Sequence, residues 1–269
     1  IAALLILVSY ERIYGCTIER DLIYDFTLIL SDFMAVIFYF IIQNFLLNIQ
    51  IFLSLYSTFK IIFILKPFTS GQLAAWRRDG YLIVKNFCSS QETDKLYSAA
   101  LQDEAMNKNA LDLNDQQGKK TRLSLWFTPG NDVFGYLTRS KKIVNSAAQL
   151  LDSDAPVCHF HSKLMQKEPK VGGAWEWHQD YGYWYKNQFM FPDQLVSVMV
   201  ALTAANKENG CLQVIKCSHK MGRVNHGFAG EQVGADMVMV DNALKTMELI
   251  YCELEPGDGL GNGTQAAGP

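Results

Sequence analysis

The sequence predicts a mainly β domain with flanking helices, an α+β protein whose strands fold as a sandwich, a barrel or a jelly roll. Up to about Leu151 the apolar residues recur at helical spacing, and from Ala155 onward they alternate or form short runs. Gly, Asn and Pro separate these later runs, which is typical of an all-β sandwich or barrel. The helices are therefore expected to form an outer layer around a core of strands.

Residues 1–67 differ from the rest because they are rich in Ile, Phe, Leu and Tyr and carry few charges. The uncharged run from Phe33 to Phe59 exceeds the roughly 20 apolar residues that cross a bilayer. One interpretation is a membrane anchor, although Gln43 and Asn44 lie mid-run, where unpaired amides are unfavourable. The other is translated non-coding sequence ahead of a real domain, because the chain begins with Ile and favours residues with A/T-rich codons.

Two capping boxes predict where helices begin after residue 67. Thr69 with Gln72 has the spacing of the first box, and Ser89 with Glu92 has that of the second. The residues between the two helices, 81–84, are predicted to form a short strand because they are Tyr, Leu, Ile and Val.

The remaining elements follow from polarity and period. The mostly polar stretch 107–120 is predicted to be a loop, and the pattern over 134–151 is predicted to be a helix. Candidate strands lie at 158–165, 194–204, 211–215, 237–240 and 247–254.

The stretch from Trp175 to Trp184 concentrates the chemistry, because it holds His178 and Asp180 among five aromatic residues. In an extended strand, side chains at i and i+2 leave the same face, so these two would point into one space. A His and a carboxylate on one face are two thirds of the 2-His-1-carboxylate triad that binds non-heme Fe(II). The alternative is a surface strand with an ordinary His and Asp.

Charge and cysteine content argue against a nucleic-acid-binding protein and against a disulfide framework. The net charge is −3 and no Lys/Arg run occurs, so the sequence predicts no nucleic-acid partner. The six scattered cysteines form no C-x-x-C pair and are expected to be reduced and mostly buried. An intracellular location is the default, or a membrane-anchored one if residues 33–59 are a span; the sequence sets no oligomeric state.

Several blocks, taken in order, resemble the phytanoyl-CoA dioxygenase family of Fe(II)/2-oxoglutarate oxygenases. They are Asp79-Gly80-Tyr81-Leu82-Ile83-Val84, Ser162-Lys163-Leu164-Met165, Trp177-His178-Gln179-Asp180, Glu208-Asn209-Gly210-Cys211-Leu212-Gln213-Val214-Ile215, Ser218-His219-Lys220 and Glu253-Leu254-Glu255-Pro256-Gly257-Asp258. The resemblance implies that residues 68–260 form a double-stranded β-helix, a cupin-like jelly roll. It also implies Fe(II), 2-oxoglutarate and O2 as cofactor and cosubstrates for hydroxylating a small organic or lipid-like substrate.

The resemblance also assigns roles to single residues. His178 and Asp180 match the first two iron ligands; Lys163 and Met199 match positions that line the 2-oxoglutarate pocket; Tyr183, Trp184 and His226 match positions near the substrate. For Lys163 the alternative is a solvated lysine, and for Met199, Tyr183 and Trp184 it is ordinary packing. His219, in the Ser-His-Lys turn, is expected to be structural, and His161 shares a strand face with Lys163.

The chain departs from the family after Leu260. Relatives continue into a strand with the distal histidine ligand and then an arginine for 2-oxoglutarate, whereas residues 261–269 contain neither His nor Arg. We therefore expect a disordered tail at 261–269, an incomplete jelly roll, a missing third ligand, weakened binding of iron and 2-oxoglutarate, and little oxygenase activity. The alternative is a binding protein without catalysis on the same fold.

Overall fold

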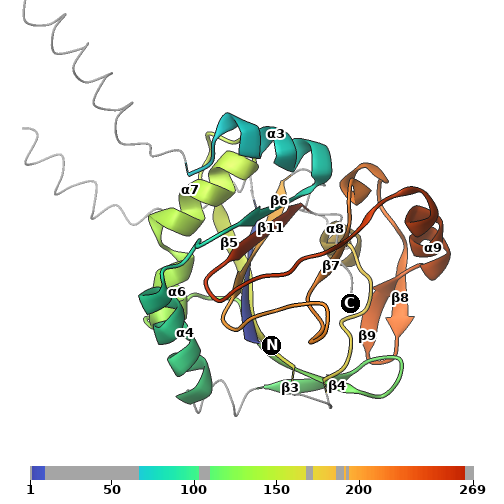
Figure 1. The fold of residues 1–269 in the computed structure, drawn as a ribbon, viewed down its shortest axis with the longest axis horizontal. Helices are drawn as coiled ribbons and strands as arrows, with labels where there is room; N and C mark the ends of the chain where they lie inside the picture. The colour runs from blue at the N-terminus through green and yellow to red at the C-terminus, as the bar shows by residue number, and fades with distance from the viewer. Residues whose placement is uncertain are drawn as a thin grey trace, which may run out of the picture. The chain divides into compact units, whose positions relative to one another are not determined.

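The computed structural model describes residues 2–9, 67–102, 110–167, 172–185, 191 and 194–263. In this part of the chain, seven strands form one antiparallel sheet in the order β2-β11-β6-β1-β5-β4-β3, and two further pairs are β10-β7 and β8-β9 (Figure 1). The strands of the large sheet are β1 (Ala2–Ser9), β2 (Tyr81–Val84), β3 (Leu111–Asn114), β4 (Lys120–Trp126), β5 (Cys158–Gln166), β6 (Leu195–Ala201) and β11 (Gly259–Gly263). The paired strands are β7 (Gln213–Ile215), β8 (His226–Ala229), β9 (Gln232–Ala235) and β10 (Leu249–Tyr251). The helices are α3 (Ser70–Asp79), α4 (Ser90–Gln102), α6 (Val133–Thr138), α7 (Lys141–Leu150), α8 (Asp180–Trp184) and α9 (Met237–Thr246).

The two predicted capping boxes are confirmed. Thr69 Oγ1 accepts from the Gln72 N–H while the Gln72 side chain reaches back to the Thr69 N–H at 2.9 Å. Ser89 and Glu92 make the same exchange at the start of α4. Each box satisfies backbone N–H groups that the first helical turn leaves unpaired.

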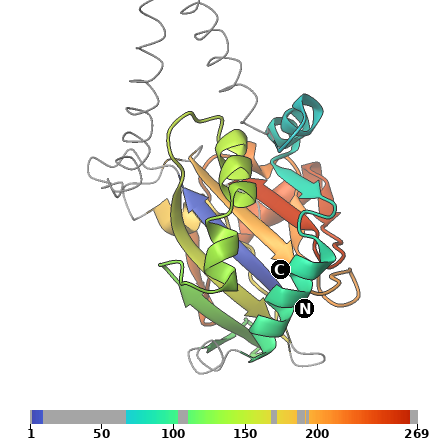
Figure 2. The same ribbon diagram turned by 90° about the vertical axis from the view of Figure 1, so that its left-hand side faces the viewer.

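Helices cover one face of the sheet. α4, α6 and α7 lie in front of it in Figure 2, and their buried side chains meet those of β5 and β6 in the main core. Leu164, Val196, Val198 and Val200 contribute from the strands, and Ile143, only 1% exposed, contributes from α7. Burial of this apolar area is the main source of stability for the domain.

The opposite face packs on the smaller strand pairs. Ala201 and Leu260 meet Val214, Cys252 and Leu254 in a second core cluster. In Figure 1 the pairs β7-β10 and β8-β9, together with α8 and α9, lie on the side of the sheet away from α4, α6 and α7. Met199, one of the residues predicted to line the cosubstrate pocket, packs in this second cluster.

The N-terminal strand β1 was not anticipated by the division at residue 67. Residues 2–9 pair antiparallel with β5 on one side and with β6 on the other, so they occupy the middle of the large sheet. A short apolar run does not distinguish a buried strand from part of a membrane segment. Residues 10–66, including the predicted span 33–59, lie outside the described residues; within those described, no helix is long and apolar enough to cross a membrane.

Three local predictions were wrong. The stretch 107–120 was predicted to be a loop, but residues 111–114 form β3 and pair with β4, because a polar strand is acceptable at the edge of a sheet. The single helix predicted over 134–151 is two, α6 and α7, because Ser140 caps the second through its side chain. Residues 237–240, predicted as a strand, begin α9, because the Asp236 side chain accepts from the Val238 N–H.

Strand β11 extends past the boundary predicted at Leu260. Gly261, Asn262 and Gly263 continue the strand and pair with β6. The three residues therefore belong to the sheet, and residues 264–269 of the predicted tail lie outside the described part of the chain.

Candidate metal centre

His178 and Asp180 lie close together, but not on a strand as predicted. Residues 173–179 form an extended connection without sheet pairing, and Asp180 is the first residue of the short helix α8. Gln179 between them is the N-cap residue, with φ −109° and ψ 130°. An extended residue followed by a helix start still turns both side chains into one space, so the predicted pair forms by a different backbone route.

The two side chains present metal-binding atoms to each other. His178 Nδ1 donates to the Glu176 carbonyl at 2.8 Å, because a carbonyl only accepts, and this leaves the lone pair on Nε2. Nε2 lies 3.6 Å from Asp180 Oδ1, a gap that one ion bound to each at about 2.1 Å spans. A carbonyl that fixes the tautomer of a ligating histidine is the usual support of a metal site.

Ser197 orients the carboxylate from the sheet. Its hydroxyl donates to Asp180 Oδ2, so one oxygen of the carboxylate is held while the other faces His178. Ser197 is 1% and Asp180 8% exposed, which makes this a buried, charge-assisted hydrogen bond. The arrangement leaves Oδ1 as the carboxylate oxygen that faces His178.

The electrostatics favour a neutral imidazole. Burial lowers the pKa of His178, and the Asp180 carboxylate opposes that shift. A neutral ring is the form that binds a metal ion.

Lys163 points into the same interior from β5. Its Nζ lies 4.7 Å from the centre of the Trp175 ring, a cation–π distance. Burial lowers the pKa of Lys163, and the charge of Asp180 raises it again in part. The alternative of a solvated surface lysine does not fit a side chain that is 9% exposed in total.

Met199 occupies the same row of the sheet as Lys163. Both are paired with Leu5 of β1, and Met199 is also paired with Leu260 of β11. Met199 is half-buried and packs in the second core cluster, so its contacts are those of a core residue at the wall of the interior.

A β-bulge aims two consecutive side chains of β5 at one place. The register with β1 shifts between Leu7 and Val8 and skips Phe160, so that both Phe160 and His161 face Trp184. Ring centres lie 5.1 Å and 5.3 Å from Trp184 respectively. Bulges commonly re-aim a side chain beside a functional site.

His161 is the buried histidine of this cluster. It is 3% exposed, and within the described residues its Nδ1 has no hydrogen-bond partner. Burial is the largest of the causes that lower the pKa of His161 to about 4, and the charge of Lys163 acts in the same direction. A neutral imidazole with an unused ring nitrogen therefore lies beside the aromatic wall.

Of the three residues predicted near the substrate, only Trp184 belongs to that wall. Tyr183 is 40% exposed and packs edge-on against Trp184 at 4.7 Å. His226 uses both ring nitrogens: Nε2 accepts from the Gln179 N–H at 2.9 Å, and Nδ1 donates to the Val224 carbonyl at 2.8 Å. These bonds make His226 a structural partner of the stretch that carries His178 and Asp180.

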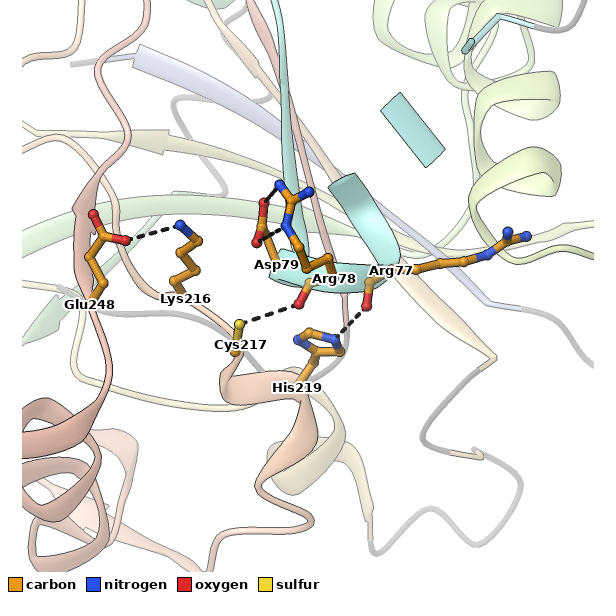
Figure 3. Close-up of polar contacts among 7 residues, drawn as sticks. All are labelled: Arg77, Arg78, Asp79, Lys216, Cys217, His219 and Glu248. Atoms are coloured by element: carbon orange, nitrogen blue, oxygen red, sulfur yellow. Dashed lines mark hydrogen bonds and ion pairs between the residues drawn. The ribbon is translucent and has the colours of Figure 1, made fainter. Parts of the chain in front are cut away.

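His219 contacts the C-terminal end of α3 and makes no bond to His178 or Asp180 among the described hydrogen bonds (Figure 3). Its Nε2 contacts the Arg77 carbonyl at 3.2 Å, while the Cys217 thiol donates to the Arg78 carbonyl at 3.3 Å and the Cys217 N–H to Asp79 O at 2.8 Å. These groups satisfy carbonyls that the last helical turn leaves unpaired. Gly80, with φ +85°, is required there because a Cβ would lie 2.2 Å from the His219 ring. This contact fits the structural role expected for His219.

Sequence reasoning missed the residues that support the pair. Ser197 interrupts an otherwise apolar strand, which is a signal of a special role, but its partner is 17 positions away in the sequence. Gln179 and Trp175 carry no local signal beyond their place in the aromatic stretch. Within the described residues, no group of three or more His, Cys, Asp or Glu side chains is placed to hold a metal.

Comparison with known proteins gives a family and a set of relatives. The family model described as phytanoyl-CoA dioxygenase matches residues 76–260 of the chain. Ectoine dioxygenase of Streptomyces avermitilis is 28% identical over 159 residues, or 57% of this chain and 52% of that protein. L-proline trans-4-hydroxylase of Streptomyces griseoviridis is 34% identical over 94 residues, 35% of this chain and 34% of that protein. The chain thus spans about half the length, or less, of these two relatives.

Solved structures show the fold. EctD from S. alaskensis with 2-oxoglutarate and 5-hydroxyectoine has a TM-score of 0.60 at 20% identity, over 75% of this chain and 69% of that one. The α-ketoglutarate-dependent carbocyclase SnoK of nogalamycin biosynthesis also gives 0.60, at 17% identity, over 74% and 76%. The predicted jelly roll with flanking helices is confirmed by these neighbours.

Proposed function

The chain belongs to the phytanoyl-CoA dioxygenase family, and on this premise we propose that His178 and Asp180 bind Fe(II) in a 2-oxoglutarate-dependent dioxygenase domain. The observation that carries the proposal is the geometry of the pair. The Glu176 carbonyl sets the tautomer of His178, and Ser197 fixes one oxygen of Asp180. These supports hold Nε2 and Oδ1 toward each other at 3.6 Å, a spacing that suits one metal ion.

The other residues of the interior would serve the cosubstrate. Bound Fe(II) with 2-oxoglutarate and O2 would supply the oxidising chemistry. Lys163 would place its ammonium beside a carboxylate of 2-oxoglutarate, where it would make a charge-assisted hydrogen bond. Without the cosubstrate, the ammonium lies over the ring of Trp175. Met199 would exclude water from the inner wall, in the same row of the sheet.

The substrate would be a small organic molecule held against Trp184, Phe160 and His161. The rings offer an apolar wall, and the free nitrogen of His161 offers one hydrogen bond. Because the relatives are named for ectoine and L-proline, these two compounds are the first to assay. Tyr183, which the resemblance placed near the substrate, would contribute only at the rim. His226 would act through its ring, which accepts from the Gln179 N–H.

We further propose that turnover is low and metal binding weak. The described residues provide two protein ligands, and each ligand lost from a metal site weakens binding. This observation also favours the second candidate function, a protein that binds iron without catalysis. Anchoring to a membrane through residues 33–59 stays a prediction, which fractionation of cell extracts would test.

The experiment that tests the enzyme function measures succinate formed from 2-oxoglutarate, with Fe(II) and O2, by the full 269-residue chain. We expect slow succinate formation that is absent in Asp180→Ala. Iron binding with no succinate would favour the second candidate, whereas equal rates in the two proteins would contradict the assignment of the site. Fast turnover of the wild-type chain would contradict the proposal of a weak site.

Lys163→Met tests the cosubstrate role separately. We expect the KM for 2-oxoglutarate to rise about tenfold or more, because a charge-assisted hydrogen bond is lost, while metal affinity changes little. An unchanged KM would remove Lys163 from the cosubstrate pocket.

A further inference from the structure

Gln179, the residue between the two proposed metal ligands, is held by hydrogen bonds from both its backbone and its side chain. Gln179 is 4% exposed, and its backbone and side chain make four hydrogen bonds. Its carbonyl accepts from the Tyr183 N–H at 2.8 Å, which starts helix α8. The other three bonds go to the segment 222–226, more than 40 residues further along the chain.

Those three bonds form a fork. The Gln179 N–H donates to His226 Nε2 at 2.9 Å, the side-chain Nε2 donates to the Gly222 carbonyl at 2.9 Å, and Oε1 accepts from the Val224 N–H at 2.7 Å. An N-cap residue normally turns its side chain back to its own helix, but this one makes no such bond. The Gln179 side chain therefore does not cap α8 and instead bonds to the distant segment 222–226.

His226 is held in a single tautomer by this fork. A backbone N–H only donates and a carbonyl only accepts, so Nε2 is bare toward Gln179 and Nδ1 carries the hydrogen toward Val224. The ring also lies against Gly182 of α8, where an added Cβ would come within 2.3 Å of His226 Cε1. Only glycine at this position lets the ring approach the helix.

From this arrangement we infer that Gln179, through its bonds to Gly222, Val224 and His226, is a positioning residue that sets the spacing of His178 and Asp180 for metal binding. The backbone torsions of Gln179 determine the angle between its two neighbours. Freedom at this residue would separate Nε2 from Oδ1. The inference rests on the proposed metal site and adds to it the element that holds the site together.

The test is Co(II) binding to the full chain, followed by the visible absorption of the bound ion, for variants of the fork. Gln179→Met keeps the side-chain length but loses both side-chain bonds, and Gly182→Ala displaces the His226 ring without changing a polar group. We expect both to raise the Kd for Co(II) about 10- to 100-fold, as mutations behind metal ligands do. His226→Leu should do the same, and His226→Gln, which keeps an acceptor for the Gln179 N–H, should recover most of the affinity.

A matched control separates positioning from general stability. His219 is another half-buried histidine bonded to a backbone carbonyl, but it serves α3. We expect His219→Ala to lower the thermal unfolding temperature and to leave the Kd for Co(II) unchanged.

Two results overturn the inference. One is a Kd for Co(II) in folded Gln179→Met and Gly182→Ala equal to that of the wild type; the other is an equal loss of affinity in His219→Ala. In both cases the proposed metal site stands. If the wild-type chain itself binds no Co(II), or binds it equally after Asp180→Ala, the proposed function fails and the inference fails with it.

Discussion

The two faces of the large sheet differ in what neighbouring residues of the same strand do. On β6, Val196, Val198 and Val200 face the helices and are almost completely buried among apolar side chains. Ser197 and Met199, which alternate with them, face the interior, where Ser197 binds Asp180. The alternation of side chains along a strand thus separates residues that pack under the helices from residues that face the candidate metal site. We expect substitutions on the first face to change stability alone and those on the second to change metal binding.

The largest expected effect is a loss of stability in the core between the helices and the large sheet, where Ile143 of α7 is buried. Ile143→Ala should lower the free energy of unfolding by about 2–5 kcal/mol, because it removes a buried side chain that is 1% exposed and leaves a cavity. The Kd for Co(II) should not change. Urea unfolding and metal titration measure the two quantities.

Val144 provides the control for that substitution. It follows Ile143 on α7 but is 36% exposed, so Val144→Ala should change the free energy of unfolding by no more than about 0.5 kcal/mol. If Ile143→Ala weakened Co(II) binding in the folded protein, the two faces would not be separable.

The second prediction concerns the pH dependence contributed by His161 on the interior face. Burial lowers its pKa from 6.5 to about 4, whereas in the unfolded chain the pKa is near 6.5. The unfolded state therefore binds more protons between these values, and stability falls as the pH decreases from about 6.5 to 4. The loss attributable to His161 reaches at most about 3–4 kcal/mol, at 1.36 kcal/mol per pKa unit.

His161→Gln tests this contribution, because the variant has no group that titrates in this range. Urea unfolding at several pH values from 7.5 to 4.5 should show a shallower decline for the variant than for the wild type. Other histidines also have lowered pKa values, among them His178, His219 and His226, so the difference between the two proteins is the informative quantity. Parallel curves would mean that the pKa of His161 is the same in the folded and unfolded states.

The features that were predictable from the sequence are those with local causes. The capping boxes at Thr69 and Ser89 work within three residues, and both are present. Strand β6 is a mostly apolar run, so its burial can be predicted without knowing which elements pack against it. His178 and Asp180 were found because two positions apart in an extended chain is a local relation.

Most of what the sequence did not reveal depends on contacts between separate stretches of the chain. The Asp236 cap of α9 is an exception, because it is a local signal beside the Met-Val-Met-Val run, whereas β3 is a strand that pairs with β4. The place of β1 in the middle of the sheet is set by pairing with β5 and β6, which are more than 140 residues away. Gln179 acquires its role from segment 222–226 in the same way. Such roles follow from tertiary contacts, which a pattern along one stretch of chain does not encode.

The smallest expected effect is the most direct test of the comparison, because it changes one atom on the interior face. Ser197→Ala removes the hydroxyl that donates to Asp180 Oδ2 and adds no bulk. We expect the Kd for Co(II) to rise about tenfold, or 1.4 kcal/mol, since the carboxylate loses the group that orients it. Val198→Ala, one residue along and on the opposite face, should lower the unfolding temperature while the Kd stays at the wild-type value. An unchanged Kd in Ser197→Ala would show that Asp180 is oriented without the sheet, and the two faces of β6 would then differ in packing alone.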